Sequence, residues 1–329
     1  MYYRKYLTPE YGEVAPEVEI MQPQEIDLNN ARAWRIQSDF ESIAAMTAAV
    51  KKCNCYTKLM QAVTDDIVCD FGEGPIRVRV YRPSIQAEKL PVLIFYHGGG
   101  YMMNSIEVYE YVFRYLCVSG NVIVVAPDYH LAPEYKFPKG LEEAYQTVLW
   151  TKKGISRFGG DPESLFVCGD SSGGNFAAVV SFLTKERSGP DLKGQILIFP
   201  VTTNYEEEMT DSEKRYEHGY FLEFNGTQYP LMPYFNDISE TKLPEASPLL
   251  KEDLSMVPPA CFINAECDPL LDQGLMYAAK LEDQGVPVEY HIMRGMVHGF
   301  INWTYRESFR ALDLTTEYMW NNHGVRSHG

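Results

Sequence analysis

The sequence predicts an α/β fold, with a mostly parallel central sheet and helices on both of its faces. The first observation is that, from residue 75 onward, short apolar or β-branched runs alternate with segments whose apolar residues recur at helical spacing. The second is that several of these runs are apolar on successive residues, as strands buried on both faces must be. A chain of 329 residues is long enough to bury the large core that such a sheet needs.

The alternating segments predict the elements of this sheet in chain order. Seven runs are predicted as strands: 76–81, 92–97, 122–127, 165–169, 196–200, 260–264 and 288–293. Four segments between or after them are predicted as helices: 109–120, 141–154, 174–189 and 272–285. Strands connected through helices in this way lie parallel in one sheet.

Two segments stand outside the alternation and predict a cap. Apolar residues recur at helical spacing over 33–50, and Asp27 and Asn29 are candidate cap residues before this helix. Residues 203–247 are dense in aromatic and acidic residues and contain no strand-like run. We expect 1–60 and 203–247 to form a helical cap on one side of the sheet. The α/β core then comprises 61–202 and 248–329.

Composition excludes several classes of protein. The chain has 29 Lys and Arg against 45 Asp and Glu, a net charge of −16, which would repel nucleic acid and anionic membrane surfaces. No apolar stretch approaches the length of a membrane span, and the N-terminus has acids and prolines where a signal peptide would be apolar. We therefore expect a cytoplasmic protein. Its seven cysteines are mostly isolated and are expected to be free thiols.

No metal site is predicted. Cys53-Asn54-Cys55 provides one pair of thiols at close spacing, and the second ligand pair of a zinc site is missing.

The most informative motif is Gly169-Asp170-Ser171-Ser172-Gly173, which joins a predicted strand to a predicted helix. Ser171 has the spacing of a G-x-S-x-G nucleophile turn, in which the backbone at the serine is strained and glycines on both sides avoid a collision. Choosing Ser172 as the nucleophile would need glycine where Asp170 stands. Ser171 is therefore the candidate nucleophile, at the N-terminus of a helix that favours developing negative charge.

A second motif, His97-Gly98-Gly99-Gly100, follows the predicted strand 92–97. Successive glycines leave backbone N–H groups unobstructed, as an oxyanion hole requires. A phosphate loop would need a following Lys-Ser or Lys-Thr, which Tyr101-Met102-Met103 does not supply. His97 precedes the glycines, so we expect it to support the loop by hydrogen bonding instead of acting as a base.

A serine nucleophile needs a histidine base and an acid that orients it, and both are expected in the order Ser, acid, His. Asp268 lies just beyond the predicted strand 260–264, and His298 lies in the loop beyond 288–293. Ends of parallel strands meet at one edge of a sheet, so we expect these side chains to lie together.

Other residues compete for the same roles. Glu266 could be a structural carboxylate at the strand end, and Asp272 fits a helix N-cap. His291 is expected to be a packed strand residue and His323 to belong to a polar tail, while His130 and His218 remain candidate substrate contacts.

Taken together, the motifs resemble the hormone-sensitive-lipase-like esterases of the α/β-hydrolase fold, also called bacterial family IV. The resemblance covers roughly residues 75–303 and depends on a combination in the family order: the HGGG loop, Ala126-to-Pro138, the GDSSGG turn, Asp268-Pro269-Leu270 and His298-Gly299-Phe300.

The resemblance implies a role for each motif. Ser171 would be the nucleophile, Asp268 the triad acid and His298 the base. The oxyanion hole would use the amides of Gly99, Gly100 and Ser172, with His97 and Gly98 supporting the loop. The cap would shape the substrate pocket, and the expected substrate contacts are Tyr101, Tyr220, Phe221 and Phe300, although most cap aromatics could simply pack the cap onto the sheet.

The chain departs from the family pattern at two positions. The family usually has alanine where Ser172 stands and arginine where His130 stands. The first change adds a hydroxyl near the oxyanion hole, and the second removes or replaces an ion pair.

The expected function is that of a serine carboxylesterase acting on short- to medium-chain acyl esters, with no cofactor and no metal. The partner is a small-molecule ester, and the resemblance also implies a homodimer. A deacetylase or amidase acting on a small metabolite would use the same residues. A non-catalytic receptor on this fold is the alternative of another class, and the intact His298-Gly299-Phe300 argues against it.

Overall fold

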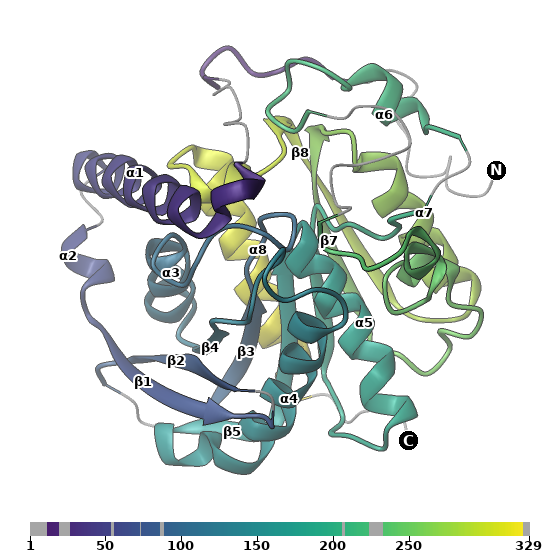
Figure 1. Cartoon of the computed structure of the whole chain (residues 1–329). Helices are drawn as coiled ribbons and strands as arrows, with labels where there is room; N and C mark the ends of the chain where they lie inside the picture. The colour runs from purple at the N-terminus through teal and green to yellow at the C-terminus, as the bar shows by residue number, and fades with distance from the viewer. Residues whose placement is uncertain are drawn as a thin grey trace.

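The computed structural model describes residues 12–19, 27–53, 56–72, 74–85, 89–205, 208–223 and 233–324. Its strands are β1 (Ala62–Asp70), β2 (Pro75–Pro83), β3 (Leu90–Tyr96), β4 (Ile123–Pro127), β5 (Gly160–Asp170), β6 (Gly194–Ile198), β7 (Ala260–Cys267) and β8 (Val288–Val297). They form one sheet of order β1-β2-β4-β3-β5-β6-β7-β8 (Figure 1). Strands β3 to β8 pair in parallel, while β1–β2 and β2–β4 are antiparallel. The predicted mostly parallel sheet is confirmed.

Two apolar cores cover the two faces of the sheet. The longer helices are α1 (Ala31–Lys52), α3 (Glu110–Gly120), α4 (Lys139–Gly154), α5 (Ser172–Glu186), α7 (Leu271–Asp283) and α8 (Arg306–His323). Apolar residues of α4, α5 and α7 belong to one core, and those of α3 and α8 to the other. Strands β3 and β7 are buried along their whole length, so both faces of the sheet are covered at these strands, as the continuous apolar runs predict.

All seven predicted strands and the predicted helices are present, but strand β1 and the long helix α8 were not predicted. Strand β1 carries Asp65, Asp66 and Asp70 and lies at the sheet edge, where its burial alternates from Asp66 to Asp70. Helix α8 extends to His323, so the expectation that His323 belongs to a polar tail is wrong. Nδ1 of His323 lies 2.6 Å from the hydroxyl of Ser164. Helix α8 is polar overall and amphipathic, and its apolar face is buried against the sheet.

In the described parts of the two segments expected to form the cap, the regular structure besides α1 is short. The first of these segments contains a 3-10 turn, Leu28–Asn30, and helix α2 (Tyr56–Leu59). Within the described part of 203–247 lie the short α6 (Asp211–Arg215) and a 3-10 turn, Ile238–Lys242. The hydroxyl of Tyr216 donates to the carbonyl of Gly12 at 3.0 Å, so this segment contacts the N-terminal part of the chain. In Figure 1, α1 lies above α3, and α6 lies above the ends of β7 and β8.

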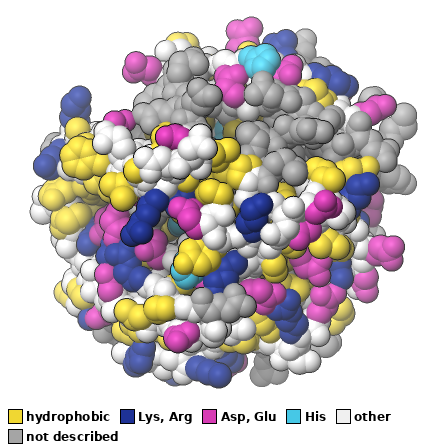
Figure 2. Space-filling model, in the orientation of Figure 1, with side chains coloured by type: hydrophobic (Ala, Val, Ile, Leu, Met, Phe, Trp, Pro, Cys, Tyr) yellow, Lys and Arg dark blue, Asp and Glu magenta, His cyan; other side chains and the backbone are white. Residues whose placement is uncertain are grey.

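The surface carries charges of both signs. On the face drawn in Figure 2, Lys and Arg are interspersed with Asp and Glu and form no continuous basic surface. No helix within the described ranges has the length and apolarity that crossing a bilayer requires. Six cysteines are free thiols as expected, and Cys55 lies outside the described residues.

Candidate active site

Ser171 occupies a sharp turn between β5 and α5. Its backbone has φ 53° and ψ −120°, a conformation that is strained for a residue other than glycine. The flanking glycines make the turn feasible, because a Cβ at Gly173 would lie 2.0 Å from the carbonyl oxygen of Tyr96, and one at Gly169 would lie 2.2 Å from that of Gly173. These close contacts explain why the nucleophile-turn motif has glycine at both positions.

The structure brings Ser171, His298 and Asp268 into one hydrogen-bonded chain. Nε2 of His298 lies 2.9 Å from the Ser171 hydroxyl, and Nδ1 lies 2.8 Å from Oδ2 of Asp268. All three are buried, with Ser171 still 8% exposed. Each directly follows a strand, namely β5, β7 or β8. With Nδ1–H donating to the carboxylate, Nε2 is left as an acceptor for the serine proton.

The competing carboxylates have other partners. Glu266 forms an ion pair with Arg294 and accepts the amide of Gly295 at 2.8 Å, as a structural carboxylate would. Asp272 accepts the amide of Ser212 at 2.9 Å. Since α7 begins at Leu271, Asp272 lies inside its first turn, and the predicted N-cap role is wrong.

The remaining histidines lie in other contacts. His130 places Nδ1 2.6 Å from Glu143, which also pairs with Lys139 at 3.0 Å. The contact between His130 and Glu143 thus replaces the ion pair that was expected from the family arginine at this position. His218 lies 3.0 Å from Glu223, and most of its side chain is exposed.

The glycine loop after β3 is held by the buried carboxylate of Asp170. The Gly98 amide donates to Oδ1 of Asp170 at 2.8 Å, and the Tyr109 hydroxyl donates to Oδ2 at 2.7 Å. Burial raises the pKa of Asp170 to about 6, while the two hydrogen bonds partly oppose that rise. Close packing also demands glycine at 98, because a Cβ there would lie 2.5 Å from Oδ2 of Asp170.

His97 is packed beneath the loop. Its ring stacks on Tyr129 with centroids 4.4 Å apart, and Nδ1 lies 2.8 Å from the carbonyl of Gly98. The Tyr129 hydroxyl donates to the His97 carbonyl at 2.7 Å. Burial lowers the pKa of His97, so the ring stays neutral near pH 7.

The predicted substrate contacts differ in their surroundings. Tyr101 is buried and stacks on Tyr234 of the 203–247 segment, with centroids 4.0 Å apart. The ring of Phe221 is 2.9 Å from the position a Cβ would take at Gly299, next to His298. Tyr220 packs edge-on against Tyr216, and Phe300 has no exposed surface and packs against Phe199.

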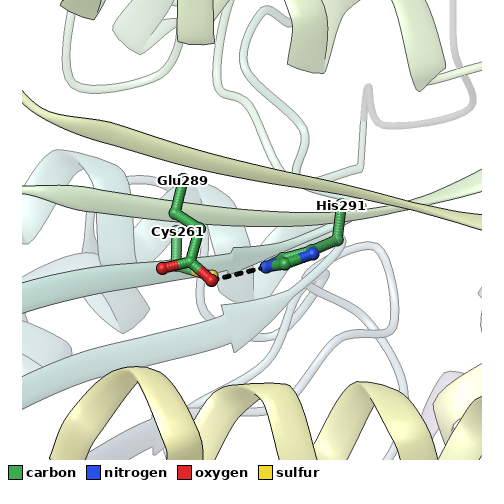
Figure 3. A group of neighbouring side chains, drawn as sticks. All are labelled: Cys261, Glu289 and His291. Atoms are coloured by element: carbon green, nitrogen blue, oxygen red, sulfur yellow. Dashed lines mark hydrogen bonds and ion pairs between the residues drawn. The ribbon is translucent and has the colours of Figure 1, made fainter. Parts of the chain in front are cut away.

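One group of described side chains has metal-ligand atoms close together. Ligand atoms of Cys261, Glu289 and His291 lie within 4.8 Å of one another on β7 and β8 (Figure 3). Nε2 of His291 is already 2.7 Å from Glu289, and burial raises the pKa of the Cys261 thiol well above its usual value, favouring the protonated form that binds metal poorly. Cys261 precedes Asp268 by seven residues of extended chain, roughly 20 Å, so this group takes no part in chemistry at Ser171.

Several residues around the site were not predicted from the sequence. Tyr109 and Tyr129 support the glycine loop, and Arg35 of α1 donates to two carbonyls beside it. Tyrosines and arginines are common, and nothing in the local sequence distinguishes these three. Asp170 could have been recognised, because its buried carboxylate directly precedes Ser171 in the motif.

Comparison with known proteins identifies the family of this chain. The alpha/beta hydrolase fold family model matches residues 93–302. The carboxylesterase NlhH of Mycobacterium tuberculosis is 37% identical over 239 residues, covering 70% of this chain and 73% of that protein. The ethyl acetate hydrolase of Pseudomonas putida is 34% identical, covering 79% of this chain and 80% of that protein.

A solved structure gives the same result. An esterase of Pyrobaculum calidifontis superposes with a TM-score of 0.80 at 32% identity, covering 92% of this chain and 96% of that one. The family match at residues 93–302 spans more than half of the chain. The chain therefore belongs to the alpha/beta hydrolase fold family, in its hormone-sensitive-lipase-like branch.

Proposed function

We propose that this protein is a serine carboxylesterase that hydrolyses short- to medium-chain acyl esters. The observation that carries the proposal is the hydrogen-bonded chain from Ser171 through His298 to Asp268, at 2.9 and 2.8 Å, with Ser171 on a strained turn. Its relatives named as carboxylesterase and ethyl acetate hydrolase support the substrate class.

The proposed mechanism is acyl transfer in two steps. Nε2 of His298 removes the proton of Ser171 as its oxygen attacks the ester carbonyl, and His298 then protonates the departing alcohol. Water, deprotonated by the same nitrogen, hydrolyses the acyl-enzyme and releases the acid. Asp268 keeps Nδ1 protonated, orients the ring and stabilises its positive charge. No step needs a metal or a cofactor.

The oxyanion is assigned to the amides of Gly99, Gly100 and Ser172. The amide of Gly98 is already bonded to Asp170, which supports the following glycines as donors. Ser172 is the first residue of α5, so its N–H belongs to the positive end of the helix dipole.

We also propose that 1–60 and 203–247 form the cap over this site. The contact of Tyr216 with Gly12 joins the two segments, and Phe221 lies beside Gly299. An aromatic cap of this kind suits short and medium acyl chains, and Tyr101, Tyr220, Phe221 and Phe300 remain the predicted contacts. Homodimerisation stays a prediction from the family resemblance.

The test is hydrolysis of p-nitrophenyl esters from acetate to palmitate by the wild type and by Ser171→Ala. We expect activity on the shorter chains that disappears in the variant. Substantial activity in a folded Ser171→Ala protein would overturn the proposal. If the wild type hydrolyses none of the esters, a deacetylase or amidase is favoured. Hydrolysis of the anilide with the same acyl group would then reveal amidase activity. Inactivity on both would favour the receptor.

A further inference from the structure

The loop after β3 has an unusual backbone conformation. Positive φ angles occur at Gly99 (124°), Gly100 (59°), Tyr101 (63°) and Asn104 (72°). Asparagine tolerates such an angle, but tyrosine is strained there, and a strained residue persists only when its surroundings hold it. The groups that hold this loop therefore determine where its glycine amides point.

Several contacts to the loop come from the core. The Ser172 hydroxyl accepts the amide of Tyr101 at 3.2 Å, and the Tyr101 carbonyl accepts the amide of Ala132 at 3.0 Å. The side-chain amide of Asn104 donates to the Gly98 carbonyl at 3.0 Å. The Gly99 carbonyl accepts the amide of Met102 at 3.1 Å, closing a tight turn.

Arg35 adds a contact from α1, 67 residues away in sequence from the loop. One nitrogen of its guanidinium donates to the carbonyls of Met102 at 3.2 Å and Ala132 at 3.0 Å. The other nitrogen pairs with Glu134. The Arg35 side chain is only 15% exposed, so its bonds to the two carbonyls are partly shielded from water, whereas Glu134 is exposed.

These contacts connect Arg35 to the loop through two backbone carbonyls. Arg35 joins the carbonyl of Met102 to that of Ala132, and Ala132 is itself bonded to Tyr101. One charged side chain thus holds the Met102 end of the turn directly and Tyr101 through Ala132. A lysine could not reproduce this fork, because its single ammonium lacks the planar geometry that engages two carbonyls and a carboxylate together.

We propose that Arg35 is a positioning residue that ties α1 to the oxyanion loop and keeps the amides of Gly99 and Gly100 aimed at the reacting carbonyl oxygen. This inference rests on the proposed esterase function. Arg35 touches the backbone beside the loop and does not contact Ser171 or His298 in the structure. Arg35 acts through the loop amides, which bind the oxyanion. Because the oxyanion forms only after attack, we expect Arg35 to stabilise the transition state more than the bound substrate.

The experiment compares Arg35→Met with the wild type on p-nitrophenyl acetate. Methionine keeps an apolar stem and removes every hydrogen bond. Since misplacement of about 1 Å can cost on the order of 100-fold, we expect kcat to fall by roughly 10- to 100-fold. KM should stay within about twofold, as expected when an interaction is made only in the transition state. Binding of a trifluoromethyl ketone, which forms a tetrahedral oxyanion on serine, should weaken by the same factor as kcat.

Three variants separate positioning from a general loss of structure. Arg310→Met removes an exposed arginine that pairs with Glu317 at 2.9 Å, and it should leave kcat unchanged. Glu134→Gln removes the ion pair but leaves both carbonyl contacts, and it should keep most of kcat. Arg35→Lys should fall between the wild type and Arg35→Met.

The outcomes distinguish this inference from the function on which it rests. An inactive wild type would overturn the proposed function. An active wild type with unchanged kcat in Arg35→Met would overturn only the role of Arg35, and so would a rise in KM at constant kcat. If Arg35→Met fails to fold, Arg35→Lys decides: a reduced kcat and weaker ketone binding at wild-type melting temperature support the role, and wild-type values overturn it.

Discussion

The hydroxyl oxygen of Ser172 accepts a hydrogen bond from the backbone amide of Tyr101, across 3.2 Å. This bond connects the first residue of α5 with the residue that follows Gly100, so the helix and the loop that are proposed to share the oxyanion are joined directly. The family usually has alanine at the Ser172 position, which cannot make this bond. The departure noticed in the sequence thus has a structural role in this chain.

Ser172→Ala tests that role. The variant leaves a buried amide without its acceptor, which costs about 1–3 kcal/mol where no water replaces it. We expect a lower melting temperature and a kcat reduced by up to about tenfold, the equivalent of about 1.4 kcal/mol. The measurements are thermal unfolding and steady-state hydrolysis of p-nitrophenyl acetate.

Ser181→Ala is the matched control for this variant. Ser181 is equally buried in the same helix, and its hydroxyl donates to the carbonyl of Ala177 at 2.8 Å. That carbonyl belongs to an ordinary helical turn, so we expect a similar or smaller stability change with kcat unaffected. Equal kcat in Ser172→Ala and Ser181→Ala would contradict a role of the Ser172 hydroxyl in catalysis.

Asp268→Asn and Glu266→Gln separate the two carboxylates at the end of β7. Asparagine at 268 would favour the wrong tautomer of His298, and the equivalent change in a serine protease with the same triad lowers kcat by about 10⁴-fold. Glu266 contacts Arg294 and Gly295, so its variant should unfold at lower temperature and retain kcat within a few fold. The reverse pattern of kcat values would reassign the acid.

The sequence predicted the parallel sheet because its strands are buried on both faces, and a continuous apolar run is visible without a structure. Strand β1 was missed because one face of an edge strand is exposed, so Asp65 and Asp66 interrupt its apolar pattern. Helix α8 was missed because its mean hydropathy is low and its apolar residues occupy only one stripe.

Some residues of the candidate site could likewise be predicted from the sequence, and others could not. Ser171, Asp268 and His298 were predicted because each lies in a short motif just beyond a strand. Arg35 was not predicted, because its acceptors are backbone carbonyls 67 and 97 residues away. No local sequence pattern shows which distant carbonyls lie near a side chain. The N-cap role of Asp272 failed because the N-cap of α7 is Leu270, two residues earlier.

Gly173→Ala tests the steric requirement of the turn. A methyl group at 173 would lie 2.0 Å from the carbonyl oxygen of Tyr96, so backbone must shift. We expect a loss of about 1–3 kcal/mol or more, typical of overpacking, together with a large fall in kcat because Ser171 moves with its turn. Urea unfolding and ester hydrolysis measure the two effects.

Gly154→Ala is the control for added volume. A methyl group there meets nothing within 4 Å, and the backbone has φ −119°. We expect unchanged activity and equal or slightly greater stability, since alanine lowers the entropy of the unfolded chain. A tolerated alanine at both positions would show that the turn has more room than the structure indicates.

We expect Asp170 to make the free energy of unfolding depend on pH. Its pKa is raised to about 6 in the folded protein, mainly by burial, from an ordinary value of 3.8. Between these values the folded state holds a proton that the unfolded chain has released, so the free energy of unfolding falls as pH rises. The full cost is reached above pH 6 and amounts to about 3 kcal/mol, taking about 1.4 kcal/mol for each pKa unit.

Asp170→Asn removes this titration, so the comparison isolates one group. Urea unfolding of both proteins from pH 4 to pH 7 should give a stability difference, variant minus wild type, that grows with pH. Asp237→Asn is the control, because hydrogen bonds to Ser239 lower the pKa of that exposed carboxyl and confine its effect to more acidic solutions. Its difference should be flat over the same range. A flat difference for Asp170→Asn as well would mean that Tyr109 and Gly98 compensate fully for burial, and that the carboxylate is as stable beneath the loop as it is in water.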